Sequence, residues 1–281
     1  MNYRHAYHAG NFADVVKHLV LTRILAHLLK KDAPFRVVDT HAGIGLYDLE
    51  ADEATRTQEW REGIARLDTP FGADVEAVLA PYREVVASVK ARYGENVYPG
   101  SPAIIREMLR SKDRGIFNEL HPEDHALLSE RYNQVPNLKT LHLDAWNALH
   151  AMIPPREKRG AVLIDPPFEE QGEMDRLVAE LARAVEKWPA GIFAAWYPVK
   201  DLRAVNRSLA PLAQFPRNVL RLEIYVERPD DPTRLTGCGM AIVNPPWTLQ
   251  AEMETVLPAL AERLARDDYG AFRCDSIGAP A

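Results

Sequence analysis

Cysteine is scarce in this sequence, and long hydrophobic runs are missing from it. Cys238 and Cys274, its two cysteines, are too few for the disulfide framework that is typical of small secreted domains. No apolar run approaches the roughly 18 residues that a membrane-spanning helix needs. The first residues lack the apolar segment of a secretory signal. We therefore expect a cytosolic protein that does not span a membrane.

An excess of positive charge is also missing. The 281 residues carry a formal net charge of −6, which disfavours a general nucleic-acid binder because such proteins need many Lys and Arg contacts to phosphates. Basic residues still cluster near the N-terminus, between residues 56 and 66 and between residues 156 and 159, so RNA binding is permitted. His5 and His8 lie close in sequence, but no Cys pair or His-Glu-x-x-His pattern accompanies them, and we expect no metal site.

Helix-like and strand-like segments alternate along most of the chain. Helical periodicity marks residues 11–31, 101–109, 122–133, 146–152, 174–187, 202–213 and 250–264; strand patterns mark residues 35–39, 116–120, 140–144, 160–164, 192–197, 219–226 and 239–244. This alternation predicts a single α/β domain over residues 1–281, with a mostly parallel sheet. No helix separates the last two strands, so we expect them to form an antiparallel hairpin at one edge. Residues 50–97 are predicted to be a helical insertion.

Three acidic residues fall at the ends of the first three predicted strands, namely Asp39, Glu119 and Asp144. Ligands of open α/β sheets bind at this edge. The loop after Asp39 contains Gly43 and Gly45, which allow the backbone to approach a ligand closely. The loop lacks the full Gly-x-Gly-x-x-Gly pattern of nicotinamide cofactors, and Asp39 would repel a pyrophosphate. A cationic sulfonium fits better, and we predict S-adenosylmethionine as the cofactor, with Glu119 at its ribose and Asp144 at its adenine.

The tetrapeptide Asp165-Pro166-Pro167-Phe168 follows the apolar run of residues 160–164. Two prolines make this loop stiff. We predict that the Asp165 carboxylate and the Pro166 carbonyl bind a planar exocyclic amine while Phe168 stacks on the ring that carries it. The hydrogen bonds would orient the nitrogen for attack on a methyl group, and Asp165 would accept the proton that the nitrogen loses. A base that reaches such a pocket must leave any helical stack.

A second tetrapeptide, Asn244-Pro245-Pro246-Trp247, has the same loose pattern after an apolar strand. If this last predicted strand is antiparallel, its carboxyl end lies at the edge of the sheet opposite to the cofactor. We therefore assign Asn244 to a structural exit from the strand and Asp165 to the reaction.

Motifs along the whole chain resemble the ribosomal RNA large subunit methyltransferase J family. They are Tyr3-Arg4-His5, His8-Ala9-Gly10-Asn11, Asp14-Val15-Val16-Lys17-His18, Asp39-Thr40-His41-Ala42-Gly43, Tyr98-Pro99-Gly100-Ser101-Pro102, Glu119-Leu120-His121-Pro122, Asp165-Pro166-Pro167 and Trp196-Tyr197-Pro198. The resemblance implies a seven-stranded, Rossmann-like methyltransferase fold and methylation of N6 of one adenine in 23S ribosomal RNA.

The resemblance also implies roles for individual residues. The implied cofactor-binding residues are His18, Asp39, His41, Gly43, Ser101, Glu119, Asp144, Ala145 and Asp165. The implied catalytic residues are Asp165, Pro166 and Phe168, and Tyr3, Arg4 and Phe168 are expected to contact RNA, assisted by the insertion. Two positions depart from the family's pattern. Phe168 replaces the usual tyrosine and keeps its stacking face, and Ala145 replaces a common glycine with another small residue.

Three other functions fit parts of this pattern. A DNA adenine-N6 methyltransferase would use the same chemistry, a non-catalytic protein could bind S-adenosylmethionine and RNA, and a nicotinamide dehydrogenase would use a similar sheet. We expect protein-poor 23S RNA or an early assembly intermediate as the partner, with no obligate protein partner.

Overall fold

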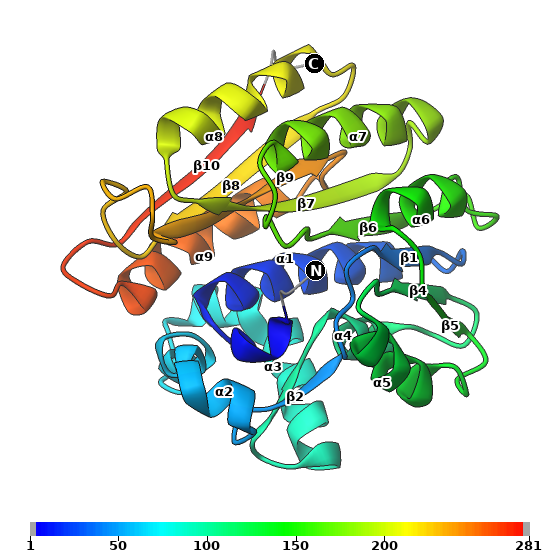
Figure 1. The fold of residues 1–281 in the computed structure, drawn as a ribbon, viewed down its shortest axis with the longest axis horizontal. Coiled ribbons are helices and arrows are strands. Elements are labelled where there is room, and N and C mark those ends of the chain that lie inside the picture. The colour runs from blue at the N-terminus through cyan, green and yellow to red at the C-terminus, as the bar shows by residue number, and fades with distance from the viewer. Residues whose placement is uncertain (1–3, 278–281) are drawn as a thin grey trace.

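The computed structural model describes residues 4–277 and contains an eight-stranded mixed sheet between two layers of helices (Figure 1). The strands of this sheet run in the order β10-β8-β9-β7-β6-β1-β4-β5. Their bounds are β1 Arg36–Asp39, β4 Arg114–Asn118, β5 Leu138–Leu141, β6 Gly160–Ile164, β7 Ile192–Val199, β8 Val219–Tyr225, β9 Gly237–Val243 and β10 Ala271–Ile277. Two short strands, β2 Leu46–Asp48 and β3 Val97–Pro99, form a separate antiparallel pair.

The predicted α/β sheet is confirmed, with one correction at its edge. Strands β5, β4, β1, β6 and β7 run parallel to one another, and β7 pairs antiparallel with β9. Strands β8 and β9 form the expected antiparallel hairpin. The hairpin does not lie at the edge, because β10 pairs antiparallel with β8 and covers it. The sequence gives little sign of β10, since its residues are only partly buried and carry no apolar run. The sequence does not predict β2 and β3 either, because each of these strands is only three residues long.

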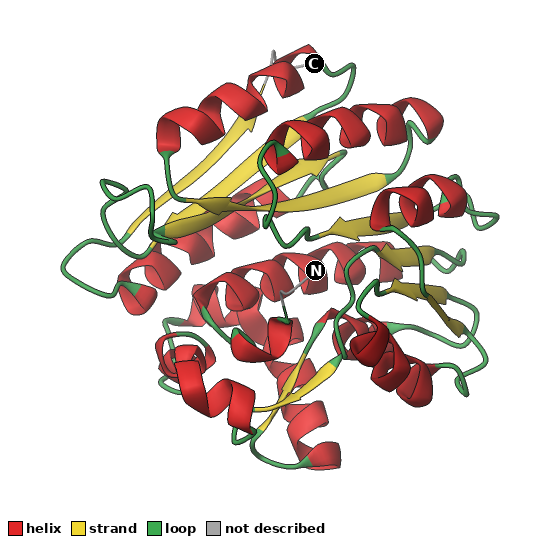
Figure 2. Ribbon diagram, in the orientation of Figure 1, coloured by secondary structure: helices red, strands yellow, loops and turns green. Residues whose placement is uncertain are grey.

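Helices cover both faces of the sheet (Figure 2). They are α1 Phe12–Leu29, α2 Asp52–Thr57, α3 Ala73–Tyr93, α4 Ser101–Met108, α5 Pro122–Tyr132, α6 Ala145–Met152, α7 Glu173–Lys187, α8 Leu202–Leu209 and α9 Leu249–Leu264. Side chains of alternate strand residues enter different cores: Val37 and Leu163 pack with α1 and α9, whereas Val38 and Val162 pack with α6 and α7. No helix of the described part is long and apolar enough to cross a bilayer.

Helix α1 is the central element of its layer. Asn11 caps its start by accepting a hydrogen bond from the N–H of Asp14. The helix then packs against α3, α4 and α9 and against the strands β6 and β9. Leu19, Ile24 and Leu25 are completely buried there. Because neighbours surround it on several sides, α1 buries polar residues as well as apolar ones, and this places Asp14, Lys17 and His18 in the interior.

The segment between β2 and β3 contains α2, two short 3₁₀ turns at Glu59–Glu62 and Ile64–Leu67, and α3. Its ends meet because β2 pairs with β3, with Leu46 opposite Pro99. Helix α3 packs on α1 and α9, so the segment rests on the same layer as α1.

Truncation of a buried residue of α1 should destabilise the whole domain. Leu19→Ala removes a fully buried side chain and leaves a cavity, and we expect a loss of about 2–5 kcal/mol in the free energy of unfolding by urea. Leu127→Ala on α5 is the matched control, because Leu127 is 38% exposed and should lose far less. Equal losses in the two variants would contradict the central packing of α1.

Candidate active site

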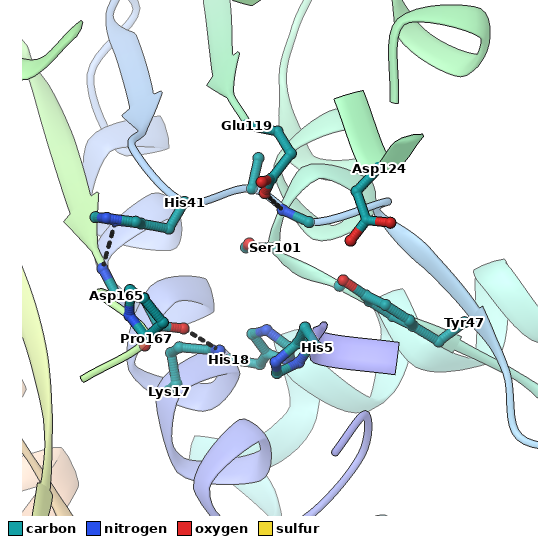
Figure 3. Close-up of a pocket in the computed structure, with 13 residues that line it drawn as sticks. His5, Lys17, His18, His41, Tyr47, Ser101, Glu119, Asp124, Asp165 and Pro167 are labelled. Atoms are coloured by element: carbon teal, nitrogen blue, oxygen red, sulfur yellow. Dashed lines mark hydrogen bonds and ion pairs between the residues drawn. The ribbon is translucent and has the colours of Figure 1, made fainter. Parts of the chain in front are cut away.

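A first cavity opens where the parallel strands end (Figure 3). It is lined by His5, Lys17, His18, His41, Ala42, Gly43, Tyr47, Gly100, Ser101, Glu119, Asp124, Asp165 and Pro167. These residues come from the 3₁₀ turn His5–Tyr7, from α1, β2 and α5, from the start of α4, and from the loops after β1, β4 and β6. The cavity therefore lies at the edge where the fold of an open α/β sheet places a ligand.

Glu119 is fixed at the end of β4 by two backbone donors. Its carboxylate accepts hydrogen bonds of 2.8 Å from the N–H groups of Gly43 and His121. Gly43 has a φ of +59°, and a Cβ there would lie 2.1 Å from the hydroxyl of Tyr47, so the loop requires glycine. Burial raises the pKa of Glu119 despite these hydrogen bonds.

Asp39 is buried at the end of β1, next to His41 and Ser101, which line the first cavity. Its Oδ1 accepts a hydrogen bond from the N–H of His41, while its buried Oδ2 has no hydrogen-bond partner among the described residues. Burial raises the pKa of Asp39 to about 7, although the Ser101 hydroxyl and the N–H of His41 act in the opposite direction. This site can accept a cation or a hydrogen-bond donor.

Lys17 is a buried cation between two carboxylates. Its Nζ lies 2.8 Å from Oδ1 of Asp14. It also lies 2.5 Å from Oδ2 of Asp165, which follows β6 (Figure 3). Burial opposes the charge on Lys17, but the two carboxylates outweigh it and raise the pKa of Lys17 well above its usual value. The same balance lowers the pKa of Asp14, because His5 and Lys17 outweigh its burial. The group is therefore a charged network.

Two of the histidines that line the first cavity, His18 and His41, differ from Lys17 in charge. Burial lowers the pKa of His18 to about 3 and that of His41 to about 4, so both rings are neutral at pH 7. His18 Nδ1 lies 2.7 Å from the hydroxyl of Tyr98, and His41 Nδ1 accepts a 3.3 Å hydrogen bond from the N–H of Asp165. His41 thus fixes the start of the loop that carries Asp165.

A second cavity lies on the other side of Asp165. Its apolar wall is formed by Pro166, Pro167, Phe168, Trp196 and Pro198. Asp165, Lys17, His5 and Pro167 line both cavities. Asp165 is therefore one of four residues at the boundary between the two cavities. Phe168 has a φ of +53°, a conformation that is uncommon for a residue with a bulky side chain and is often found at functional sites.

The structure brings most of the predicted cofactor residues together. His18, His41, Gly43, Ser101, Glu119 and Asp165 line the first cavity, and Asp144 and Ala145 line an adjoining third cavity that also includes His41, Glu119 and Pro167. Asp144 caps α6 by accepting hydrogen bonds from two backbone N–H groups. Gly100 is the N-cap of α4, and Ser101 is its first helical residue.

The two residues predicted near the N-terminus are placed differently. Tyr3 lies outside the described residues. Arg4 donates a 2.9 Å hydrogen bond to Asp124 and lies 3.5 Å from Glu123, so it ties the N-terminal segment to the start of α5. Any contact of Arg4 with RNA would compete with these two carboxylates.

The second Pro-Pro motif lies at the opposite edge, as predicted. Strand β9 runs antiparallel to β7, so Asn244 emerges where β7 begins. Its side-chain amide donates hydrogen bonds to the carbonyls of Pro189 and Gly191, at 3.0 and 2.7 Å.

Sequence reasoning gave no role to Lys17, Asp14, His5 or Trp196. The first two carried a usable signal, because a Lys and an Asp three residues apart in an apolar helix imply a buried ion pair. The approach of Lys17 to Asp165 could not be seen, since 148 residues separate them in the chain.

Comparisons with known proteins find several that resemble this chain. A family model described as "Ribosomal RNA large subunit methyltransferase D, RlmJ" matches residues 32–277. Two similar proteins are each named ribosomal RNA large subunit methyltransferase J. The one from Haemophilus influenzae is 36% identical over 281 residues, covering 99% of each chain, and the one from Escherichia coli is 39% identical over 269 residues, covering 94% of each. A crystal structure of a protein from Legionella pneumophila, 32% identical, has a TM-score of 0.85 and covers 96% of this chain and 98% of its own.

Removal of the buried cation should destabilise the protein most at neutral pH. Lys17→Met leaves Asp14 and Asp165 close together without their common partner, and we expect a loss of about 3–5 kcal/mol in the free energy of unfolding. Lys17 is one of the groups that lower the pKa of Asp14, so loss of the cation raises the pKa of that carboxyl in the folded state. The destabilisation therefore shrinks as the pH falls and Asp14 binds a proton. Urea unfolding across this range measures it, and Lys139→Met, at an exposed position of β5, is the control. A loss that does not vary with pH would argue against the network.

Asp39 should make stability fall with rising pH. Its folded pKa of about 7 exceeds the ordinary 3.8, so between these values the folded protein keeps a proton that the unfolded chain loses. The free energy of unfolding therefore decreases with pH in this window and levels off above it. Asp39→Asn removes this dependence, and its stability relative to the native protein should rise from about pH 4 to about pH 7 in urea unfolding. Parallel pH profiles of the two proteins would refute the raised pKa.

Proposed function

The chain belongs to the ribosomal RNA large subunit methyltransferase J family, and from this premise we propose that it transfers a methyl group from S-adenosylmethionine to N6 of one adenine in 23S ribosomal RNA. The observation that carries this proposal is the position of Asp165 between the first and second cavities. A methyl donor on one side and an acceptor base on the other would meet at this carboxylate.

The first cavity fits the cofactor. When bound, S-adenosylmethionine supplies an electrophilic methyl group on a cationic sulfur. Its cationic groups suit a cavity backed by the unpartnered Oδ2 of Asp39 and lined by Glu119. The residues that would hold the cofactor are His18, His41, Gly43, Ser101 and Glu119 in the first cavity and Asp144 and Ala145 in the third. The neutral rings of His18 and His41 add no positive charge that would repel it.

Asp165 orients the amine and accepts its proton. Among the described residues, the hydrogen bond of Lys17 to the carboxylate reaches Oδ2, which leaves Oδ1 available for the N6 amine. The Pro166 carbonyl, at the rigid start of the loop, supplies the second acceptor. These two acceptors turn the nitrogen lone pair toward the methyl group and stabilise the charge that develops on nitrogen. Transfer of the methyl group to nitrogen would break its bond to the sulfur of the cofactor and leave that sulfur neutral. The nitrogen would then lose one N–H proton, and Asp165 would accept it.

Phe168 forms the stacking face for the base. Its ring lies against the second cavity, and its strained backbone conformation turns the chain there. The adenine must leave a helical stack to reach this cavity. We further propose that Tyr3, Arg4 and the insertion of residues 50–97 contact the RNA around the target.

We propose that the enzyme works in the cytosol on protein-poor 23S RNA or an early assembly intermediate, without an obligate protein partner. A cavity that receives an extruded base favours this substrate, because proteins of the finished ribosome would hinder extrusion of the base. Comparison of methyl transfer to naked 23S RNA and to assembled large subunits tests this part of the proposal.

Asp165→Ala should abolish methyl transfer without loss of the fold. We expect the rate on 23S RNA from cells lacking the enzyme to fall at least about 100-fold, because orientation and proton acceptance are lost together. Incorporation of a labelled methyl group measures the rate, and calorimetry should show that S-adenosylmethionine still binds.

Asn244→Ala, in the second Pro-Pro motif, is the matched control and should retain full activity. Near-native transfer by Asp165→Ala would refute the catalytic role of Asp165. Transfer by the native protein to matching DNA oligonucleotides instead of RNA would identify a DNA methyltransferase, and binding of cofactor and RNA without transfer would identify a non-catalytic protein.

A further inference from the structure

Strand β7 is longer than the strand beside it. The pairing of β6 with β7 ends at Ile164 opposite Ala195, whereas β7 continues to Val199 and stays paired with β9. The last residues of β7, from Trp196 onward, therefore project past the end of β6. They lie beside the loop of residues 165–168 that leaves β6. The two segments form one wall of the second cavity.

Successive side chains of this extension point to opposite sides, as in any strand. Tyr197 and Val199 are completely buried in the core. Trp196, Pro198 and Lys200 alternate with them and line the second cavity. We name residues 196–200 the β7 extension. Its cavity face is an apolar wall, made by an aromatic ring and a proline, that ends in a cation.

The rings of Trp196 and Phe168 form a corner. Their centroids are 5.8 Å apart and their planes are inclined by 60°. Two rings at this angle cannot both stack on one flat base, so a base that stacks on one ring meets the other with its edge. Such a corner fixes the rotation of the base as well as its plane, and rotation decides whether the amine faces Asp165.

Lys200 differs from the other Lys and Arg residues of the second cavity. Lys17 is paired with Asp14 and Asp165, Arg234 with Glu227, and Arg266 with Glu62 and Glu227. Lys200 is exposed and has no ion pair within the described chain. An unpaired lysine at the end of an apolar wall suits a ligand that has an aromatic base and an adjacent phosphate.

We infer that the β7 extension is the second wall of the target-nucleotide site, where Trp196 contacts the target adenine and Lys200 binds a phosphate of the RNA strand beside it. This inference rests on the proposed function, since it names residues that position its substrate. It assigns to β7 a role in orienting the base that is separate from the proton acceptance by Asp165.

Truncation of Trp196 should impair use of RNA but not binding of the cofactor. For Trp196→Ala we expect kcat/KM for 23S RNA to fall on the order of tenfold, with an unchanged dissociation constant for S-adenosylmethionine by calorimetry. Trp247→Ala is the matched control, because Trp247 is 82% exposed at the opposite edge. Native kcat/KM in Trp196→Ala would overturn the role of Trp196.

Fluorescence keeps the inference testable if Trp196→Ala does not fold. RNA should quench the tryptophan emission of the native protein through stacking, and Trp196→Phe should lose much of this quenching while Trp247→Phe keeps it. Equal quenching in the two Phe variants would count against contact of Trp196 with the base.

Lys200 is tested through the salt dependence of RNA binding. Lys200→Ala should reduce the slope of log affinity against log salt by roughly one, because one phosphate contact is lost. Arg207→Ala, at an exposed position of α8 that lines neither cavity, removes the same charge and should leave the slope unchanged. An unchanged slope in Lys200→Ala would overturn the phosphate contact. Absence of methyl transfer by the native protein would instead refute the proposed function itself.

Discussion

The ion pair between Lys17 and Asp165 is the contact on which the active site depends. It joins the first helix to the end of β6 across 148 residues of sequence, and both side chains are largely buried. A buried ammonium is unfavourable unless several acceptors surround it. Asp14 supplies the second carboxylate, and Asp14 is itself held by His5 and by the N–H of Gly10. The position of Asp165 is therefore set by the network that Lys17 forms with Asp14 and His5.

This network also explains the charge distribution of the site. Lys17 is the buried cation, whereas burial keeps the imidazoles of His18 and His41 neutral. Acidic groups end β1 and β4. A cavity of this composition favours a ligand with positive charge, and it would reject the pyrophosphate of a dinucleotide. Burial acts on both kinds of group: it removes the positive charge of the two imidazoles, and it raises the pKa of Asp39 and Glu119.

Much of this fold and part of the site could be predicted from the sequence, because they depend on local pattern. Asp39 and Glu119 follow apolar strands, and parallel strands bring their ends together whatever lies between them in the chain. The rest depends on long-range packing. Strand β10 has no apolar run and forms only because β8 offers it an edge. Likewise, the corner between Phe168 and Trp196 forms because β7 extends past the end of β6. The residue pattern of a strand does not show where its neighbour in the sheet ends.

The two Pro-Pro motifs show why topology decides chemistry here. Each follows an apolar strand and begins with a residue that can bind an amine. Strand β6 is parallel to β1 and delivers Asp165 to the edge with the cavities, whereas β9 is antiparallel to β7 and delivers Asn244 to the other edge. There the side-chain amide of Asn244 donates hydrogen bonds to the carbonyls of Pro189 and Gly191, and these bonds stabilise the start of β7. One Pro-Pro motif therefore orders the beginning of β7, and the other lies beside its end. The direction of a strand, which no tetrapeptide encodes, determines which of the two can meet a substrate.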